Sequence, residues 1–279
     1  MEQFSTRVAL ITGGASGIGL GIARACARQG MNLVLADVEA NALEAAAQEL
    51  GSSQTQVVTK QTDVTDPAAV EALADLAYRT FGAVNVLCNN AGVIENNKPA
   101  WEYSLDDWDW VLGVNVMGVV HGIKSFVPRM LTQGEPAHIV NTASVGGLIA
   151  GIATPIYVVS KHAVVALSEC VYNSLARVPE DVNISVLCPG WVNTAIVDSD
   201  RNRDGAPEMS ESDQRSRSKF RAGVESGMDP NEVGEIVLDG IRQPRFYILT
   251  HPQLMSHVEE RFAAMKGFEK PASTILPLD

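Results

Sequence analysis

The chain has 279 residues, of which 46% are hydrophobic and 19% charged, and a protein of this size and composition folds without disulfide or metal support. Its formal net charge of −12 repels phosphate backbones and anionic lipid, so we expect neither nucleic acid nor a membrane as a partner. The four cysteines and five histidines are scattered without metal or redox spacing, which indicates buried reduced thiols, no metal site and a cytoplasmic protein.

Segments typical of strands and helices alternate from the start of the chain. Short apolar runs predict strands at residues 7–12, 32–37, 55–64, 84–92, 137–144, 183–190 and 245–250. Helices are predicted at residues 17–29, from the second strand to residue 50, and at 67–81, 105–130 and 155–177. Strands that are apolar on both faces are covered by helices on each side. We therefore predict one α/β domain over residues 1–279, a Rossmann-like, doubly wound parallel sheet of about seven strands with helices on both faces.

Residues 197–229 break this alternation, because they are rich in charged and small polar residues and show little apolar periodicity. A mobile loop or lid is the natural interpretation, and we expect a substrate lid over residues 195–229. A surface insertion without function is the alternative. The basic residues of this segment are interleaved with acidic ones, which is typical of a solvated mixed-charge surface.

Two stretches bear on membrane targeting. The first residues, MEQFSTRVALITGG, show no cationic stretch followed by a long apolar one, so we expect no secretory signal. The most apolar long stretch, residues 111–127, contains Asn115, His121 and Lys124, which favours a buried helix over a transmembrane span.

A glycine-rich loop joins the first predicted strand to the first helix and reads TGGASGIG over residues 12–19. Glycines here let the chain turn sharply and let a pyrophosphate approach the main-chain N–H groups, while the helix N-terminus adds the positive end of its dipole. The spacing TGxxxGxG differs from the usual GxGxxG fingerprint. The residues expected to contact the cofactor are Gly13, Ser16, Gly17, Ile18 and Gly19.

Asp37 ends the second predicted strand, where a carboxylate can accept hydrogen bonds from both hydroxyls of an adenosine ribose and would repel a 2′-phosphate. Val38 and Glu39 follow, and no arginine or lysine is near in the sequence to neutralise that phosphate. The sequence therefore predicts NAD(H) over NADP(H), with a helix N-cap as the structural alternative for Asp37. Asn90 and Gly92 lie in NNAG at the end of the fourth predicted strand, where small residues permit close approach of the cofactor.

Four polar residues form the candidate catalytic set. Tyr157 and Lys161 are spaced i, i+4 and so project from one face of a helix, where the ammonium and a positive nicotinamide ring would lower the pKa of the tyrosine toward that of a general acid/base. Such a pair alone is common on protein surfaces. Ser144 ends the fifth predicted strand, where its hydroxyl can hold a substrate oxygen. Asn115 is an amide in an apolar helix, where it could hold a water that links Lys161 to solvent.

These motifs occur together and in one order: TGxxxGxG, the acidic Asp37, NNAG, the set Asn115–Ser144–Tyr157–Lys161, and PGxxxT at residues 189–194. In this combination the chain resembles the short-chain dehydrogenase/reductase family over about residues 7–195. The resemblance implies the fold, a nicotinamide cofactor and hydride transfer without a metal. It also implies that Asp63 and Val64 lie along the adenine, and that the cofactor-binding residues include Val192 and Thr194, the latter on the nicotinamide carboxamide.

We therefore predict an NAD-dependent short-chain dehydrogenase that interconverts a secondary alcohol and a ketone. The residues expected to line its substrate pocket are mostly apolar: Ile94, Val145, Ile149, Ile152, Trp191, Ala195 and Ile196. Such a pocket favours a bulky hydrophobic or aromatic substrate, an aryl carbinol or a hydroxysteroid, ahead of sugar alcohols and acyl-thioester ketones. The alternative is a non-catalytic NAD-binding regulator or scaffold with the same fold.

The predicted helix at residues 155–177 is apolar on more than one face. A sheet covers one face of a helix, so the other apolar face needs a second partner. Together with the family resemblance, this predicts a homodimer or homotetramer.

Overall fold

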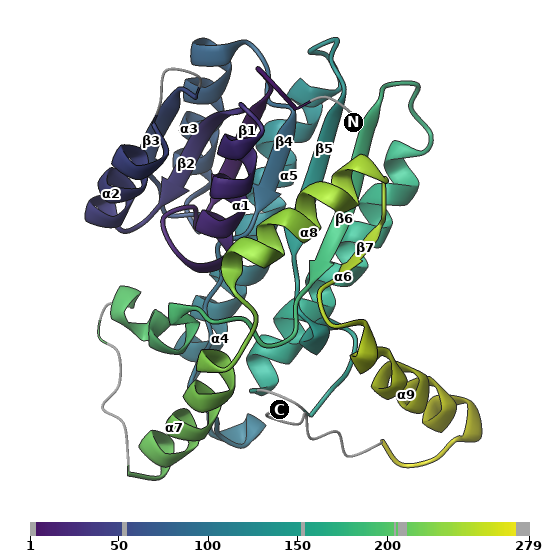
Figure 1. Cartoon of the computed structure of the whole chain (residues 1–279). Coiled ribbons are helices and arrows are strands. Elements are labelled where there is room, and N and C mark those ends of the chain that lie inside the picture. Colours follow the sequence, from purple (N-terminus) through teal and green to yellow (C-terminus); the bar gives the residue numbers. More distant parts are fainter. Residues whose placement is uncertain (1–3, 52–54, 152–153, 204, 206–210, 272–279) are drawn as a thin grey trace.

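A computed structural model describes residues 4–51, 55–151, 154–203, 205 and 211–271 of the chain. They form one seven-stranded parallel sheet in the order β3-β2-β1-β4-β5-β6-β7 (Figure 1), which confirms the predicted doubly wound α/β fold. The strands are β1 (Val8–Thr12), β2 (Asn32–Asp37), β3 (Val57–Gln61), β4 (Val86–Asn89), β5 (Ala137–Thr142), β6 (Val182–Cys188) and β7 (Tyr247–Leu249).

Helices cover both faces of this sheet. Their bounds are α1 (Gly17–Arg28), α2 (Ala40–Leu50), α3 (Pro67–Phe81), α4 (Leu105–Leu112), α5 (Gly118–Met130), α6 (Pro155–Leu175), α7 (Glu211–Glu225), α8 (Pro230–Arg242) and α9 (Met255–Gly267). α1, α2 and α8 share one apolar core with β1 and β2, and α3 and α5 share a second core on the opposite face. α4, α7 and α9 lie beyond one end of the strands (Figure 1).

The predicted helix at residues 105–130 is continuous but contains a π-helical turn at Gly113–Met117, between α4 and α5. By length and composition this run is long and apolar enough to cross a membrane. However, Phe126 and Met130 pack into the core beneath the sheet, which is the position of a core helix. π-turns are frequent at functional sites, and this one carries Asn115.

Three expectations differ from the structure in detail. The prediction that all four thiols are buried is wrong for Cys170, which is exposed on α6. The strands predicted at residues 55–64, 84–92 and 245–250 are shorter in the structure, where β3 spans Val57–Gln61, β4 Val86–Asn89 and β7 Tyr247–Leu249. The sequence analysis assigns no element to α8 or α9, although Asp229 begins α8 as an N-cap whose side chain accepts a hydrogen bond from the N–H of Asn231.

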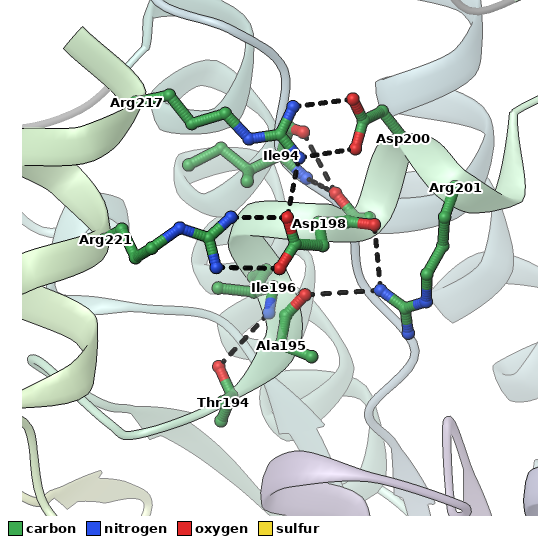
Figure 2. Close-up of polar contacts among 10 residues, drawn as sticks. Ile94, Thr194, Ala195, Ile196, Asp198, Asp200, Arg201, Arg217 and Arg221 are labelled. Carbon is green, nitrogen blue, oxygen red and sulfur yellow. Dashed lines mark hydrogen bonds and ion pairs between the residues drawn. The ribbon is translucent and has the colours of Figure 1, made fainter. Parts of the chain in front are cut away.

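The segment at residues 195–229 is largely helical where a loop is predicted. Its described part consists of a 3-10 helix at Ala195–Asn202, called η4 below, followed by α7. Apolar periodicity does not predict these helices, because the contacts that hold them together are mainly ion pairs (Figure 2).

Candidate active site

The loop between β1 and α1 has a backbone that only glycine adopts readily. Gly13 and Gly17 have φ angles of +61° and +50°. A Cβ atom on Gly19 would lie 2.0 Å from the carbonyl oxygen of Gly13, so the loop packs directly against α1. Ser16, the N-cap of α1, makes no side-chain capping bond, so its side chain does not occupy the N–H groups of the helix N-terminus, which can bind an anion. The loop therefore fits a pyrophosphate.

A cavity of about 590 Å³ runs along the carboxyl edge of the sheet and collects most of the predicted cofactor-binding residues. Those in its wall are Gly13, Ser16, Gly17, Ile18, Asp37, Asp63, Val64, Asn90, Gly92, Tyr157, Lys161 and Thr194. Gly19 and Val192 are buried outside this lining set. The cavity thus joins the ends of six strands, β1 to β6, as an extended dinucleotide would require.

Asp37 lies in the cavity wall at the end of β2. Its Oδ2 accepts a hydrogen bond from the N–H of Ala15 at 3.2 Å, and its Oδ1 accepts one from the N–H of Glu39 at 3.2 Å. Burial raises the pKa of Asp37, while these N–H groups act in the opposite direction. The N-cap position of α2 belongs to Glu39, so Asp37 does not serve as that helix cap.

Tyr157, Lys161 and Ser144 meet at the other end of the cavity. The Nζ of Lys161 donates a hydrogen bond to the carbonyl of Thr142 at 3.0 Å and lies 5.4 Å from the centroid of the Tyr157 ring. Burial raises the pKa of Tyr157 to about 12, and hydrogen bonding to Ser144 opposes this rise. Burial lowers the pKa of Lys161 to about 8. The surrounding protein therefore favours the neutral form of both groups.

Asn115 is held by protein groups. Its Oδ1 accepts the N–H of Val93 at 2.8 Å, and its Nδ2 donates to the carbonyl of Val93 and to the hydroxyl of Ser160, both at 3.0 Å. Both amide hydrogens are thus engaged. The predicted relay water could therefore bind to the second lone pair of Asn115 Oδ1 or to the backbone carbonyl of Asn115. The side chain ties α6 to the loop after β4, and a Cβ on Gly92 would lie within 3.5 Å of both Asn115 Oδ1 and Lys161 Nζ.

Glu95 is a site residue that the sequence analysis does not identify. Its Oε1 accepts hydrogen bonds from the N–H groups of Ile156 and Tyr157, at 3.1 and 3.3 Å, and so caps the first turn of α6. Its Oε2 is buried and has no hydrogen-bond partner among the described residues. Burial raises the pKa of Glu95, while the nearby hydroxyl of Thr154 and the capped N–H groups lower it. A glutamate within the apolar stretch after NNAG is the signal that could have revealed it.

Comparison with known proteins agrees with this geometry. Residues 7–205 match the family model of the short chain dehydrogenases. The chain is a short-chain dehydrogenase/reductase. It is 35% identical over 261 residues to 1-deoxy-11-beta-hydroxypentalenate dehydrogenase of Streptomyces exfoliatus, covering 93% of this chain and 88% of that one. It is also 35% identical over 190 residues to 3beta-hydroxysteroid dehydrogenase 2 of Eggerthella lenta, covering 68% and 72% of the two chains.

A solved structure extends the likeness of this dehydrogenase to nearly its full length. It is a short chain dehydrogenase/reductase from Burkholderia phymatum in complex with NAD, with 41% identity and a TM-score of 0.95 over 99% of this chain and 100% of that one. The oxidoreductase family and the Rossmann-like fold are therefore established for this chain.

The substrate end of the dehydrogenase differs from the predicted pocket. Among the seven predicted lining residues, Ala195 and Ile196 line the cavity, while Ile152 lies outside the described residues. Val145, Ile149 and Trp191 instead pack together with residues of α9 and the turn before it. Ile94 borders a separate small pocket. The cavity wall contains instead Val93, Asp106, Trp110, Val114, Ser199 and Arg203, a mixture of apolar and charged groups.

Ion pairs fix η4 against α7 in the dehydrogenase, as Figure 2 shows. Arg217 donates to Asp200 through both Nη atoms at 2.7 Å and to Asp198 at 2.9 Å, and Arg221 binds both carboxylate oxygens of Asp198. The Arg217 side chain is 12% exposed, so this cluster is more buried than the solvated surface that the sequence predicts. Bidentate geometry and partial burial make such pairs stronger than isolated surface pairs.

Proposed function

We propose that the protein is an NAD(H)-dependent dehydrogenase that interconverts a secondary alcohol and a ketone. The observation that carries the proposal is the convergence of Tyr157, Lys161 and Ser144 at one end of a cavity whose other end holds Asp37. The glycine-rich loop fits the pyrophosphate that would join these two ends.

The bound nicotinamide supplies the hydride for ketone reduction, or accepts it in alcohol oxidation. In reduction, the Tyr157 phenol donates its proton to the ketone oxygen as the carbonyl carbon gains the hydride; in oxidation, the phenolate accepts the hydroxyl proton. Lys161 stabilises the phenolate by its positive charge. Ser144 donates a hydrogen bond to the same substrate oxygen while negative charge develops on it.

The preference for NAD(H) follows from charge at the adenosine end. Asp37 lines the cavity there, and its carboxylate disfavours a 2′-phosphate. The NAD complex of the related Burkholderia protein supports this choice. Equal or better kcat/KM with NADPH than with NADH would overturn it.

A bulky hydrophobic alcohol, of the hydroxysteroid or aryl carbinol type, is the proposed substrate class. Trp110 offers a flat surface and Val93, Val114 and Ile196 add apolar area to the cavity wall. The printed names of two relatives, a hydroxypentalenate and a hydroxysteroid dehydrogenase, support a cyclic alcohol. A panel that also contains sugar alcohols and acyl-thioester ketones tests this class, and strong preference for a small polyol would contradict it.

The deciding experiment is Tyr157→Phe, assayed by NADH absorbance with that panel. We expect kcat to fall by about 10²-fold or more because the general acid/base is lost, with NADH binding retained. Tyr172→Phe is the matched control: Tyr172 lies on the same helix, is exposed and keeps its ring contact with Phe246. Unchanged turnover in Tyr157→Phe would refute the assignment, and wild-type inactivity with every substrate would favour a non-catalytic NAD-binding regulator or scaffold.

A further inference from the structure

Two segments far apart in the chain meet at the adenosine end of the cavity. The Oε1 of Glu39, at the start of α2, accepts hydrogen bonds from Arg201 Nη2 at 2.5 Å and from Asn202 Nδ2 at 3.0 Å. Arg201 and Asn202 belong to the end of η4. All three residues line the same cavity as Asp37. An arginine that is distant in the sequence is thus present beside the position that selects the cofactor.

The position of Arg201 does not depend on Glu39 alone. Its Nη1 donates to the carbonyls of Ala195 and Asp198, at 3.3 and 2.9 Å, within η4 itself (Figure 2). The Asp198 carboxylate is in turn held by Arg217 and Arg221 of α7. Removal of the Glu39 side chain should therefore leave the Arg201 guanidinium in the cavity wall.

Glu39 compensates the charge of this guanidinium. The hydrogen bonds from Asn202 and Arg201 lower the pKa of Glu39, so the carboxylate remains ionised at neutral pH. Arginine is the side chain best suited to bind a phosphate through two parallel hydrogen bonds. Because Glu39 occupies the Nη2 of Arg201, the guanidinium cannot bind a phosphate in this way.

We propose that Glu39 is a second cofactor-selecting residue, which acts by occupying Arg201, a latent receptor for the 2′-phosphate of NADP(H). This inference rests on the proposed use of NAD(H). Asp37 then excludes the phosphate directly, and Glu39 occupies a nearby cation that would attract it.

The test compares Asp37→Ser, the double variant Asp37→Ser/Glu39→Ala, and a triple variant that adds Arg201→Ala. Calorimetry measures the affinity of each for 2′,5′-ADP, which carries the 2′-phosphate, and for 5′-ADP, which does not. Glu39 makes no side-chain capping bond to α2, so its truncation leaves the helix start intact. Binding of 5′-ADP should stay within a few-fold across the series and reports an intact adenosine site.

We expect the double variant to bind 2′,5′-ADP about tenfold more tightly than Asp37→Ser, since a charge-assisted hydrogen bond contributes roughly that factor. The triple variant should lose the gain, and the kcat/KM ratio of NADPH to NADH should follow the same order. A double variant no better than Asp37→Ser, or a gain that survives Arg201→Ala, would overturn the inference. Neither result touches the proposed use of NAD(H), which fails instead if the wild-type enzyme prefers NADPH.

Discussion

Glu95 offers a direct test of how the catalytic helix is held. In Glu95→Ala, two N–H groups of the first turn of α6 lose their acceptor in a region that is largely excluded from water. A buried polar group without a partner costs about 1–3 kcal/mol, so the free energy of unfolding should fall by roughly 2–4 kcal/mol. Glu95→Gln keeps an oxygen for both N–H groups and should remain within about 1 kcal/mol of wild type at neutral pH.

The difference in stability between wild type and Glu95→Gln should change with pH in a definite direction. Burial raises the folded-state pKa of Glu95 above its unfolded value, so the carboxylate opposes folding once it is ionised. Below the unfolded pKa the group is protonated in both states and this cost is absent. As pH rises through the folded-state pKa, wild type should therefore lose stability relative to Glu95→Gln. Urea unfolding of both proteins from about pH 4 to pH 8 measures this trend, and Glu102→Ala is an exposed control expected to stay within about 0.5 kcal/mol.

Kinetic measurements distinguish an effect of Glu95 on Tyr157 from a purely structural role. Glu95 caps the backbone N–H of Tyr157 and its negative charge raises the pKa of that tyrosine. Glu95→Gln should therefore shift the acid/base limb of the kcat–pH profile to lower pH, while Glu95→Ala should lower kcat more than it changes KM for the cofactor. An unshifted profile in Glu95→Gln, or a stability loss in Glu95→Ala below about 0.5 kcal/mol, would refute the reasoning.

Two further predictions concern packing. A Cβ on Gly21 would lie 2.0 Å from the carbonyl oxygen of Pro230, so Gly21→Ala should force α1 and α8 apart. In urea titrations we expect its free energy of unfolding to fall by about 1–3 kcal/mol. The control Gly113→Ala, whose Cβ would lie 3.5 Å from the nearest atom, should not lower it. Val159 and Cys170 of α6 are exposed and lie on one face of the helix, and we propose that this face pairs with a second copy; light scattering at a single 29.8 kDa mass would contradict that.

The sheet and the cofactor loop could be predicted because their signals are local. A parallel strand buried on both faces appears in the sequence as a short apolar run, as Val8–Thr12 does. A position that needs a positive φ is indicated by the glycine found there. The spacing of Tyr157 and Lys161 likewise places both on one helix face without knowledge of the rest of the fold.

The helices η4 and α7 and the substrate end could not be predicted because their contacts join distant parts of the chain. Arg217 and Arg221 hold η4 through aspartates that are 17 to 23 residues away in sequence, and Arg201 contacts Glu39, which is 162 residues away. The α9 helix covers Val145 and Ile149, which removes them from the cavity. Hydrophobic periodicity does not predict such contacts, because each depends on where the sheet brings its connecting segments together.

In the reaction proposed above, the burial of the site would allow one tyrosine to serve both directions. In a desolvated site, charges interact more strongly than in water, so one added positive charge changes the balance between phenol and phenolate considerably. With the neutral reduced nicotinamide beside it, Tyr157 keeps the raised pKa that burial imposes and is ready to donate a proton to a ketone. Beside the positively charged oxidised ring, the phenolate is favoured and can accept the proton of an alcohol. Lys161, whose pKa of about 8 leaves it mostly protonated at neutral pH, supports the phenolate in both cases. In the proposed reaction, the charge of the cofactor bound in the cavity would therefore favour one direction of proton transfer at Tyr157.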